Sequence, residues 1–251
     1  MMVVVDTLQG RTALVTGASG GIGTALARRL ADEGVDLALA FAGHRDDAEA
    51  LAAECSDRGV RTVALRADLA EPEESHRLAE AAFSALGPLD IVVPGAGAGT
   101  RTDWQDVDHD LWQRTFTVNT WSPFALAQAA LPGMLERGWG RILLISSVAA
   151  FTGGVIGPHY TASKAALHGL VHSLASTGAP AGVTVNAVAP ALITGTRMLP
   201  TGPGGQGDPA VPIPVGRLGR PEEVADLMLA MLRNGYLTGK VVALDGGLYP
   251  A

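Results

Sequence analysis

The sequence predicts an α/β protein in which one doubly wound, seven-stranded parallel sheet carries helices on both faces. Short aliphatic and β-branched runs alternate with amphipathic segments, and this alternation implies parallel strands joined by right-handed crossovers. The strand runs are almost continuously apolar, as is typical of strands that helices cover on both sides. No change of composition divides the chain, so residues 1–251 are predicted to form a single domain.

Each predicted element rests on its own residue pattern. Seven short runs rich in aliphatic and β-branched residues are predicted strands: Thr12–Thr16, Val35–Phe41, Arg61–Arg66, Asp90–Val93, Arg141–Ser146, Val183–Ala189 and Lys240–Leu244. Segments with apolar residues at three- and four-residue spacing are predicted helices: Ile22–Ala31, Asp46–Arg58, Glu73–Leu86, Asp110–Arg137, Tyr160–Thr177 and Pro221–Arg233. Several of the 32 glycines directly follow an apolar run, where a strand passes into a helix.

Charge and cysteine content exclude several classes of protein. The 18 Lys and Arg residues against 25 Asp and Glu residues give a net charge of −7, and no basic run interrupts this balance. Nucleic acid and anionic membranes are therefore not expected as partners. Cys55 is the only cysteine, so no internal disulfide can form and a cytoplasmic location is expected. Met1–Val5 is apolar but lacks the basic residues of a signal peptide, and no run approaches the roughly 20 apolar residues of a membrane span.

Leu199–Gly216 is the one long irregular segment, with five Gly and five Pro residues. Such a loop in a compact domain is either a functional lid or a disordered segment. It follows the carboxyl end of a predicted strand, where open α/β sheets bind ligands. We therefore expect a substrate lid over about residues 194–216.

A glycine-rich turn joins the first predicted strand to the first predicted helix and reads Thr16-Gly17-Ala18-Ser19-Gly20-Gly21-Ile22-Gly23. Glycine lets the backbone turn tightly and approach a pyrophosphate, whose charge the amides at the helix N-terminus stabilise. The spacing is Gly-x-x-x-Gly-x-Gly rather than the commoner Gly-x-Gly-x-x-Gly. An ordinary glycine-rich turn is the alternative interpretation.

Tyr160 and Lys164 lie four residues apart and share one face of a predicted helix. A phenol with a pKa near 10 is a poor acid or base at neutral pH, and a neighbouring cation lowers that pKa. An accidental surface pair is the alternative. However, the chain uses Arg almost exclusively and has Lys only at 164 and 240, which indicates a specific need for a compact cation. Ser146 and Ser147 end the preceding strand and are expected to face the same crevice.

Together these motifs resemble the short-chain dehydrogenase/reductase family in its single-domain form, nearly from end to end. The family's glycine motif matches Thr16–Gly23, and its Tyr-x-x-x-Lys matches Tyr160 and Lys164. The further matches, in chain order, are Asp68 with Leu69, Asn119 between Val118 and Thr120, Ser147, Val185–Pro190, Arg217–Glu223 and Thr238-Gly239 with Asp245–Gly247. The resemblance implies a Rossmann-type fold that binds NADP or NAD.

The resemblance also implies a reaction, the NAD(P)(H)-dependent interconversion of a carbonyl and a secondary alcohol by hydride transfer. Ser147 would donate to the carbonyl oxygen and Tyr160 would deliver the proton. Lys164 would lower the pKa of Tyr160 and hold the ribose, and Asn119 would anchor a proton-relaying water. The implied cofactor contacts are Gly17, Ser19, Gly20, Gly21, Ile22, Gly23, Phe41, Arg45, Asp68, Leu69, Gly95, Ala96, Gly97, Tyr160, Lys164, Pro190, Ile193 and Thr194.

Two departures from the family pattern concern the cofactor site. Pro94-Gly95-Ala96-Gly97 replaces Asn-Asn-Ala-Gly and removes side chains expected to brace the central sheet. Ala191 replaces the Gly after Pro190, and the Thr expected just beyond Ile193 is shifted, so that Thr194 and Thr196 are both candidates.

The end of the second predicted strand bears on the choice of cofactor. A carboxylate there would accept from the ribose 2′-hydroxyl of NAD, whereas the 2′-phosphate of NADP requires cations. Phe41-Ala42-Gly43-His44-Arg45 holds no acid, so NADP is favoured, with Arg45 as the candidate phosphate contact. Asp46 and Asp47 favour NAD, and a solvated helix start is the alternative for Arg45.

The helix predicted over Tyr160–Thr177 also carries His168 and His172 at the spacing of a zinc pair. No third ligand lies at a sensible spacing, so no metal is predicted. Small residues on the same helix suit close packing, and we expect a homotetramer or homodimer through this helix and Asp110–Arg137.

The substrate remains open beyond a small carbonyl or alcohol. Chains of this type are often 3-oxoacyl carrier-protein reductases, which grip an acidic carrier with basic residues near two helix ends. Here the second of these regions, Ser176–Gly182, has no basic residue, which argues against carrier docking. A catalytically silent dinucleotide-binding sensor or scaffold is the rival to an enzyme; Pro94 and Ala191 are its only support.

Overall fold

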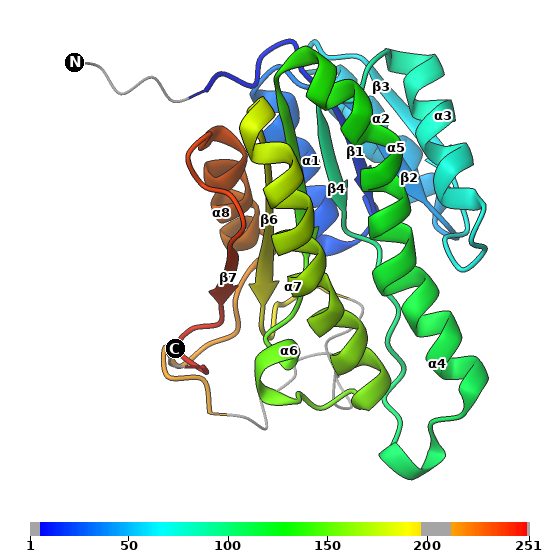
Figure 1. Cartoon of the computed structure of the whole chain (residues 1–251), viewed down its shortest axis with the longest axis vertical. Coiled ribbons are helices and arrows are strands. Elements are labelled where there is room, and N and C mark those ends of the chain that lie inside the picture. Colours follow the sequence, from blue (N-terminus) through cyan, green and yellow to red (C-terminus); the bar gives the residue numbers. More distant parts are fainter. Residues whose placement is uncertain (1–5, 197–211, 250–251) are drawn as a thin grey trace.

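The computed structural model describes residues 6–196 and 212–249, and in them the predicted seven-stranded parallel sheet is confirmed (Figure 1). The strand order is β3-β2-β1-β4-β5-β6-β7. The strands are β1 (Thr12–Thr16), β2 (Asp36–Phe41), β3 (Thr62–Arg66), β4 (Ile91–Pro94), β5 (Gly140–Ile145), β6 (Val183–Pro190) and β7 (Val241–Leu244). Each end differs from its predicted position by at most one residue.

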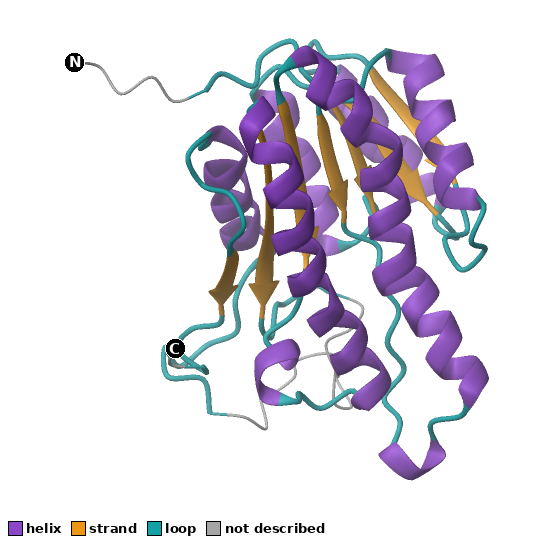
Figure 2. Ribbon diagram, in the orientation of Figure 1, coloured by secondary structure: helices purple, strands orange, loops and turns teal. Residues whose placement is uncertain are grey.

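Two helical layers cover the sheet (Figure 2). One core lies between the sheet and α1 (Gly21–Asp32), α2 (Arg45–Ser56) and α8 (Pro221–Arg233). The other lies beneath α3 (Glu74–Leu86), α5 (Ser122–Arg137) and α7 (Pro158–Gly178). Burial on both faces explains why the strands read as continuous apolar runs.

The helix predicted over Asp110–Arg137 is present, but it is not a regular α-helix throughout. The segment consists of α4 (His109–Phe116), a π-helical turn η2 (Thr117–Trp121) and α5. Short helices also occur where none was predicted, namely η1 (Trp104–Asp106), α6 (Ala149–Thr152) and η3 (Ala179–Ala181). Single π turns inside α-helices are frequent at functional sites, and this one places Asn119 fully buried at its centre.

The chain leaves neighbouring strands β1 and β4 in opposite directions. From β1 it passes through α1 to β2, whereas from β4 it passes through α4 and α5 to β5 on the other side. A crevice therefore opens at the carboxyl ends of these strands. In Figure 1 the arrowheads of β6 and β7 point to this same end, where α4 and α6 also lie.

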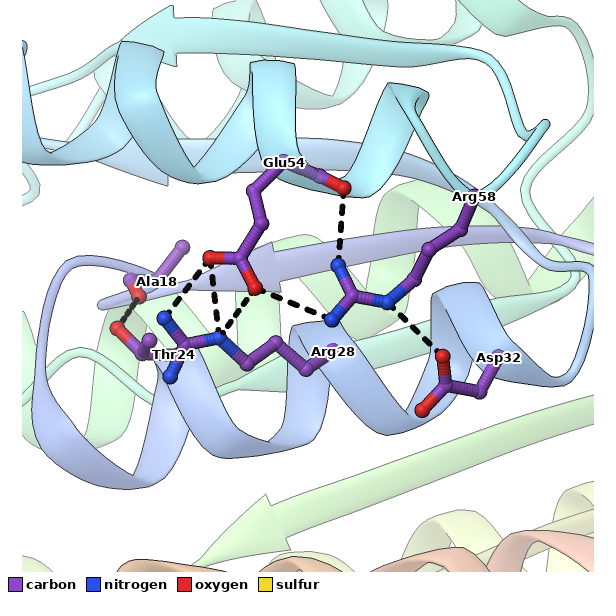
Figure 3. A network of polar contacts seen from close by, with 6 residues as sticks. All are labelled: Ala18, Thr24, Arg28, Asp32, Glu54 and Arg58. Atoms are coloured by element: carbon purple, nitrogen blue, oxygen red, sulfur yellow. Dashed lines mark hydrogen bonds and ion pairs between the residues drawn. The ribbon is translucent and has the colours of Figure 1, made fainter.

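An ion-pair network joins the two helices that flank β2 (Figure 3). Glu54 of α2 accepts hydrogen bonds from both Arg28 of α1 and Arg58, and Arg58 also reaches Asp32. All four side chains are partly exposed, so this network contributes modestly to stability. It links α1 to α2 and to Arg58, which follows α2.

A buried arginine lies at the opposite, amino end of the sheet. Arg141 is the second residue of β5, its side chain is only 2% exposed, and it pairs with Asp6. It also donates to the carbonyl oxygens of Gly140 (2.8 Å), Gly182 (3.1 Å) and Leu232 (2.9 Å). One side chain thus ties the start of β5 to α8, to the turn before β6 and to the N-terminal segment.

Most of the predicted lid, residues 197–211, lies outside the described residues. Its flanking residues are placed: Val215 donates its backbone N–H to the Gly246 carbonyl, so the segment after the gap packs against the turn that follows β7. No helix within 6–196 or 212–249 is long and apolar enough to span a membrane.

Candidate active site

The glycine turn between β1 and α1 is built so that side chains cannot enter it. Gly17 has φ +68°, and a Cβ there would lie 2.8 Å from the carbonyl oxygen of Gly95. A Cβ on Gly21 would lie 2.6 Å from the carbonyl oxygen of Gly195, and one on Gly23 would overlap the Gly17 carbonyl. The free amides at the start of α1 therefore remain open to a phosphate group.

A cavity of about 680 Å³ runs from this turn along the carboxyl ends of the central strands. Sixteen of the predicted cofactor contacts line it: Gly17, Ser19, Gly20, Gly21, Ile22, Gly23, Phe41, Asp68, Leu69, Gly95, Ala96, Gly97, Tyr160, Lys164, Pro190 and Ile193. Ser147 lines it as well. A cavity of this volume, lined both by the glycine turn and by the hydroxyl groups of Ser147 and Tyr160, fits a dinucleotide.

The Pro94 departure is compensated by other side chains. Pro94 is buried and pairs in register with Thr16, whose hydroxyl accepts from the Ala96 N–H at 3.0 Å. Asn119 holds Ala98, two residues further on, since its side-chain amide accepts from the Ala98 N–H and donates to the Ala98 carbonyl, both at 2.8 Å. The loop after β4 is therefore braced without the family's asparagines.

The residues predicted to be catalytic converge at the carboxyl end of β5. Tyr160 and Lys164 lie on the first turns of α7 and are 6% and 4% exposed. Lys164 Nζ donates to the carbonyl oxygen of Ile145 at 2.8 Å, and a side-chain hydrogen bond joins Ser147 to Tyr160. The predicted grouping of Ser147, Tyr160 and Lys164 is thus present in the fold.

Burial sets the proton affinities of this group. Desolvation lowers the pKa of Lys164 from its ordinary 10.5 to about 8. Desolvation also raises the pKa of Tyr160, and the hydrogen bond from Ser147 only partly opposes it. The sequence predicted a lowered pKa for Tyr160. The structure gives the opposite direction for the free protein, because burial disfavours the phenolate more than its neighbours stabilise it.

Asn119 is buried behind Ser147, Tyr160 and Lys164 and is not among the residues that line the cavity. Besides clamping Ala98, its side chain donates to Ser163 Oγ at 2.9 Å, and Ser163 donates to the Tyr160 carbonyl at 2.7 Å. Both amide hydrogens are thus used within the protein. A water-anchoring role for Asn119 stays a prediction, and its observed bonds fix α7 to the loop after β4.

Comparison with known proteins agrees with this geometry. The family described as short chain dehydrogenase matches residues 11–202. The chain belongs to the short-chain dehydrogenase family. It is therefore an oxidoreductase, and the resemblance that its motifs predicted is confirmed.

Several similar proteins match nearly the whole chain. An L-rhamnose 1-dehydrogenase (NAD(P)(+)) from Sphingomonas sp. (strain SKA58) is 34% identical, over 96% of this chain and 97% of its own. A 3-oxoacyl-[acyl-carrier-protein] reductase FabG from Staphylococcus aureus (strain Mu50) is 33% identical, over 95% and 98%. The crystal structure of a blue fluorescent protein from a metagenomic library in complex with NADPH has a TM-score of 0.89 and 35% identity, over 98% of this chain and 100% of that one.

Two predicted cofactor contacts of this short-chain dehydrogenase are not among the described residues that line the cavity. Arg45 extends along α2, where it pairs with Glu49 at 2.9 Å. The Thr194 hydroxyl instead donates to the Gly219 carbonyl oxygen at 3.2 Å. The other candidate, Thr196, lines the cavity.

Among the lining residues that the sequence analysis did not assign to the cofactor are His44, Arg114 and Val118. His44 directly precedes α2, on the side of the strand end that faces the cavity. Arg114 and Val118 lie one turn apart on α4 and η2, just before Asn119. Their four-residue spacing was the available signal, since it places both side chains on one helical face.

Proposed function

We propose that this short-chain dehydrogenase interconverts a carbonyl and a secondary alcohol by hydride transfer with NADP(H), and with NAD(H) less efficiently. The observation that carries the proposal is the buried group of Ser147, Tyr160 and Lys164 at the inner end of a dinucleotide-shaped cavity. The nicotinamide cofactor, when bound, supplies or accepts the hydride. The protein supplies a proton and stabilises charge on the substrate oxygen.

The protein groups divide these tasks. Tyr160 Oη is the proton donor in reduction, because its raised pKa keeps the phenol protonated at neutral pH. Ser147 donates a hydrogen bond to the same oxygen as negative charge develops there. Lys164, with a pKa of about 8, is a cation at neutral pH that can release its proton at modest cost.

Tyr160→Phe tests this proposal. The variant keeps the buried ring and removes only the hydroxyl, so folding and NADPH affinity should hardly change. Hydride transfer should fall by about 10² to 10⁴, the usual share of positioned acid-base catalysis. The measurement is single-turnover oxidation of NADPH across a panel of ketones, sugars and 3-oxoacyl thioesters. Near-normal turnover by Tyr160→Phe would rule out this mechanism.

NADPH preference is proposed from the groups at the end of β2. The cavity is lined there by Phe41, Ala42, Gly43 and His44. None of them has a carboxylate that could accept a hydrogen bond from the ribose 2′-hydroxyl of NAD. The NADPH complex of a 35% identical structure supports the same choice. Calorimetric titration of NADPH and NADH should show the preference. Arg45→Ala and His44→Ala, measured side by side, identify which cation meets the 2′-phosphate.

The substrate is proposed to be a small neutral carbonyl compound or its alcohol. Ala98, Ala191 and Ile193 line the inner end of the cavity and carry no charge. The end of α7, where basic residues would grip a carrier protein, offers none, because Ser176–Gly182 contains no Lys or Arg. A 3-oxoacyl thioester remains in the panel because a 33% identical relative is a FabG reductase.

We also propose that the protein is a homotetramer or homodimer through α5 and α7. Trp121, the last residue of η2 directly before α5, is 40% exposed, and small residues occur along α7. Light scattering at micromolar concentration is the test. A mass near 25.7 kDa would show a monomer and overturn this assembly.

A further inference from the structure

His168 of α7 forms a hydrogen bond behind the catalytic group that the reaction itself does not require. Its Nε2 lies 2.9 Å from Ser146 Oγ, and Ser146 Oγ lies 3.1 Å from the carbonyl oxygen of Lys164. Ser146 is 3% exposed, so water does not compete for these hydrogen bonds.

The two contacts fix which atoms donate. The Ser146 hydroxyl has one hydrogen, and the Lys164 carbonyl can only accept, so that hydrogen points to Lys164. Ser146 Oγ must then accept from His168, and His168 must carry its hydrogen on Nε2. Because a neutral imidazole has a single N–H, His168 is committed to Ser146.

Ser146 is the middle of three consecutive residues that each bind α7. The Ile145 carbonyl accepts from Lys164 Nζ, and Ser147 is joined to Tyr160 by a side-chain bond. Ser146 binds the Lys164 backbone, and His168 completes its bonding. The position of the Ile145 carbonyl, and with it the burial of Lys164 Nζ, therefore depends on this middle attachment.

The imidazole is itself held by an aromatic stack. Phe151 of α6 lies 4.8 Å from the His168 ring, and Tyr249 lies 5.2 Å from Phe151 on the other side. The Tyr249 N–H donates to Asp245 at 2.7 Å, which fixes the turn after β7. The stack reaches from the carboxyl-terminal turn to the catalytic strand end.

We propose that His168 is a positioning residue for hydride transfer, which acts through Ser146 to hold the end of β5 against Lys164 and Tyr160. The proposal rests on the proposed function for its consequence in catalysis. Its direct effect is on the protein alone, and it can be measured without turnover.

The ionisable groups around His168 are few among the described residues. On α7 they are Lys164 and His172, on the carboxyl-terminal turn Tyr249 and Asp245, and the adjoining part of β5 and α6 contribute none. Burial, and to a smaller extent His172, lowers the pKa of His168, which keeps its ring neutral at neutral pH. The neutral ring is the form that the hydrogen-bond pattern requires.

The chain has two lysines, Lys164 and Lys240, so lysine labelled with ¹³C at Cε gives two NMR signals, and Lys240→Arg assigns them. Titration then reports the pKa of Lys164 directly. In His168→Leu the strand end loosens and water reaches Nζ, so the pKa of Lys164 should rise by about one pH unit. His168→Gln places an amide N–H where Nε2 was, and should restore the wild-type value.

His172→Leu is the matched control, because it makes the same change one turn along the same helix at an exposed side chain. It should leave the pKa of Lys164 unchanged. Ser146→Ala should reproduce the shift of His168→Leu, and the double variant should show no further shift because both act at one attachment. If His168→Leu does not fold, Ser146→Ala and His168→Gln carry the same test.

The proposal is overturned if His168→Leu folds and leaves the pKa of Lys164 unchanged, or if the two single shifts add. With a ketone that the wild type reduces, kcat of His168→Leu should fall by roughly 10-fold to 100-fold, as for a misplaced reacting group. KM for NADPH should not change. A wild-type protein that reduces no substrate would refute the proposed function. The lysine titration would still decide whether His168 positions the strand end.

Discussion

The two ends of β5 each carry a buried cation, and the two cations are held in different ways. Arg141 is the second residue of the strand, at its amino end, and Lys164 donates to the Ile145 carbonyl at its carboxyl end. Their exposures are 2% and 4%, and burial lowers the pKa of both.

The two cations differ in their hydrogen-bond partners. Arg141 pairs with Asp6 and donates to three backbone carbonyls, whereas Lys164 donates to one carbonyl and forms no ion pair within 6–196 or 212–249. A guanidinium is planar and always charged, and its fork suits several fixed acceptors, whereas an ammonium shifts its pKa readily on burial. A buried cation whose donors all have acceptors stabilises the fold. A buried cation with donors to spare can take part in a reaction.

The same substitution at both sites tests this contrast. Lys164→Met keeps the length of the apolar stem and removes the charge, so hydride transfer should fall by about 10² to 10⁴. The free energy of unfolding at pH 7 should not decrease, because a poorly solvated charge is removed with it. Single-turnover kinetics and urea unfolding measure the two effects. A large loss of stability would show that Lys164 is a structural cation like Arg141.

Arg141→Met should give the reverse pattern. It leaves three carbonyl oxygens and part of the Asp6 carboxylate without a donor, which should cost about 4 kcal/mol of unfolding free energy. The site lies at the other end of the sheet, so kcat of the folded fraction should stay within about twofold of wild type. Urea unfolding followed by assays well below the transition midpoint separates the two quantities. A loss of kcat as large as that of Lys164→Met would contradict the division between the two ends.

The contrast also shows what the sequence could and could not predict. Tyr160 and Lys164 were identified because both lie within one helical turn, where local spacing determines proximity. Arg141 looked like an ordinary strand start, because its acceptor at Leu232 is 91 residues away and only the fold brings them together. The bond between His168 and Ser146 was missed for the same reason, since it spans two elements.

The π turn at Asn119 could not be predicted from periodicity. The apolar pattern of Asp110–Arg137 is consistent with one continuous helix, and a single extra residue in a turn barely disturbs it. The strands were predicted to within one residue because both of their faces are buried and their apolar runs are continuous.

The pH dependence of stability should differ at the two ends. The pKa of Lys164 is about 8 in the folded protein and 10.5 ordinarily, so the unfolded chain binds this proton more tightly. Between about pH 8 and 10.5 unfolding takes up a proton, and the stability of the wild type should rise relative to Lys164→Met by up to about 3 kcal/mol. Tyr160 is present in both proteins, so its ionisation affects both. Parallel curves for the two proteins across this range would show that Lys164 is not desolvated.

Asp6→Asn should have the smallest effect on the free energy of unfolding. It tests whether Arg141 stabilises the fold through the Asp6 carboxylate or through the backbone carbonyls. The Asp6 side chain is 38% exposed, so water screens its attraction to Arg141, and an asparagine oxygen can still accept from the guanidinium. We therefore expect a loss of about 1 kcal/mol in unfolding free energy, reduced further in 1 M salt. Three backbone carbonyls remain as acceptors in the variant, and they are what keep Arg141 buried. A loss close to that of Arg141→Met would mean that the carboxylate, not the carbonyl set, holds the cation, and the contrast with Lys164 would then rest on the presence of an anion alone.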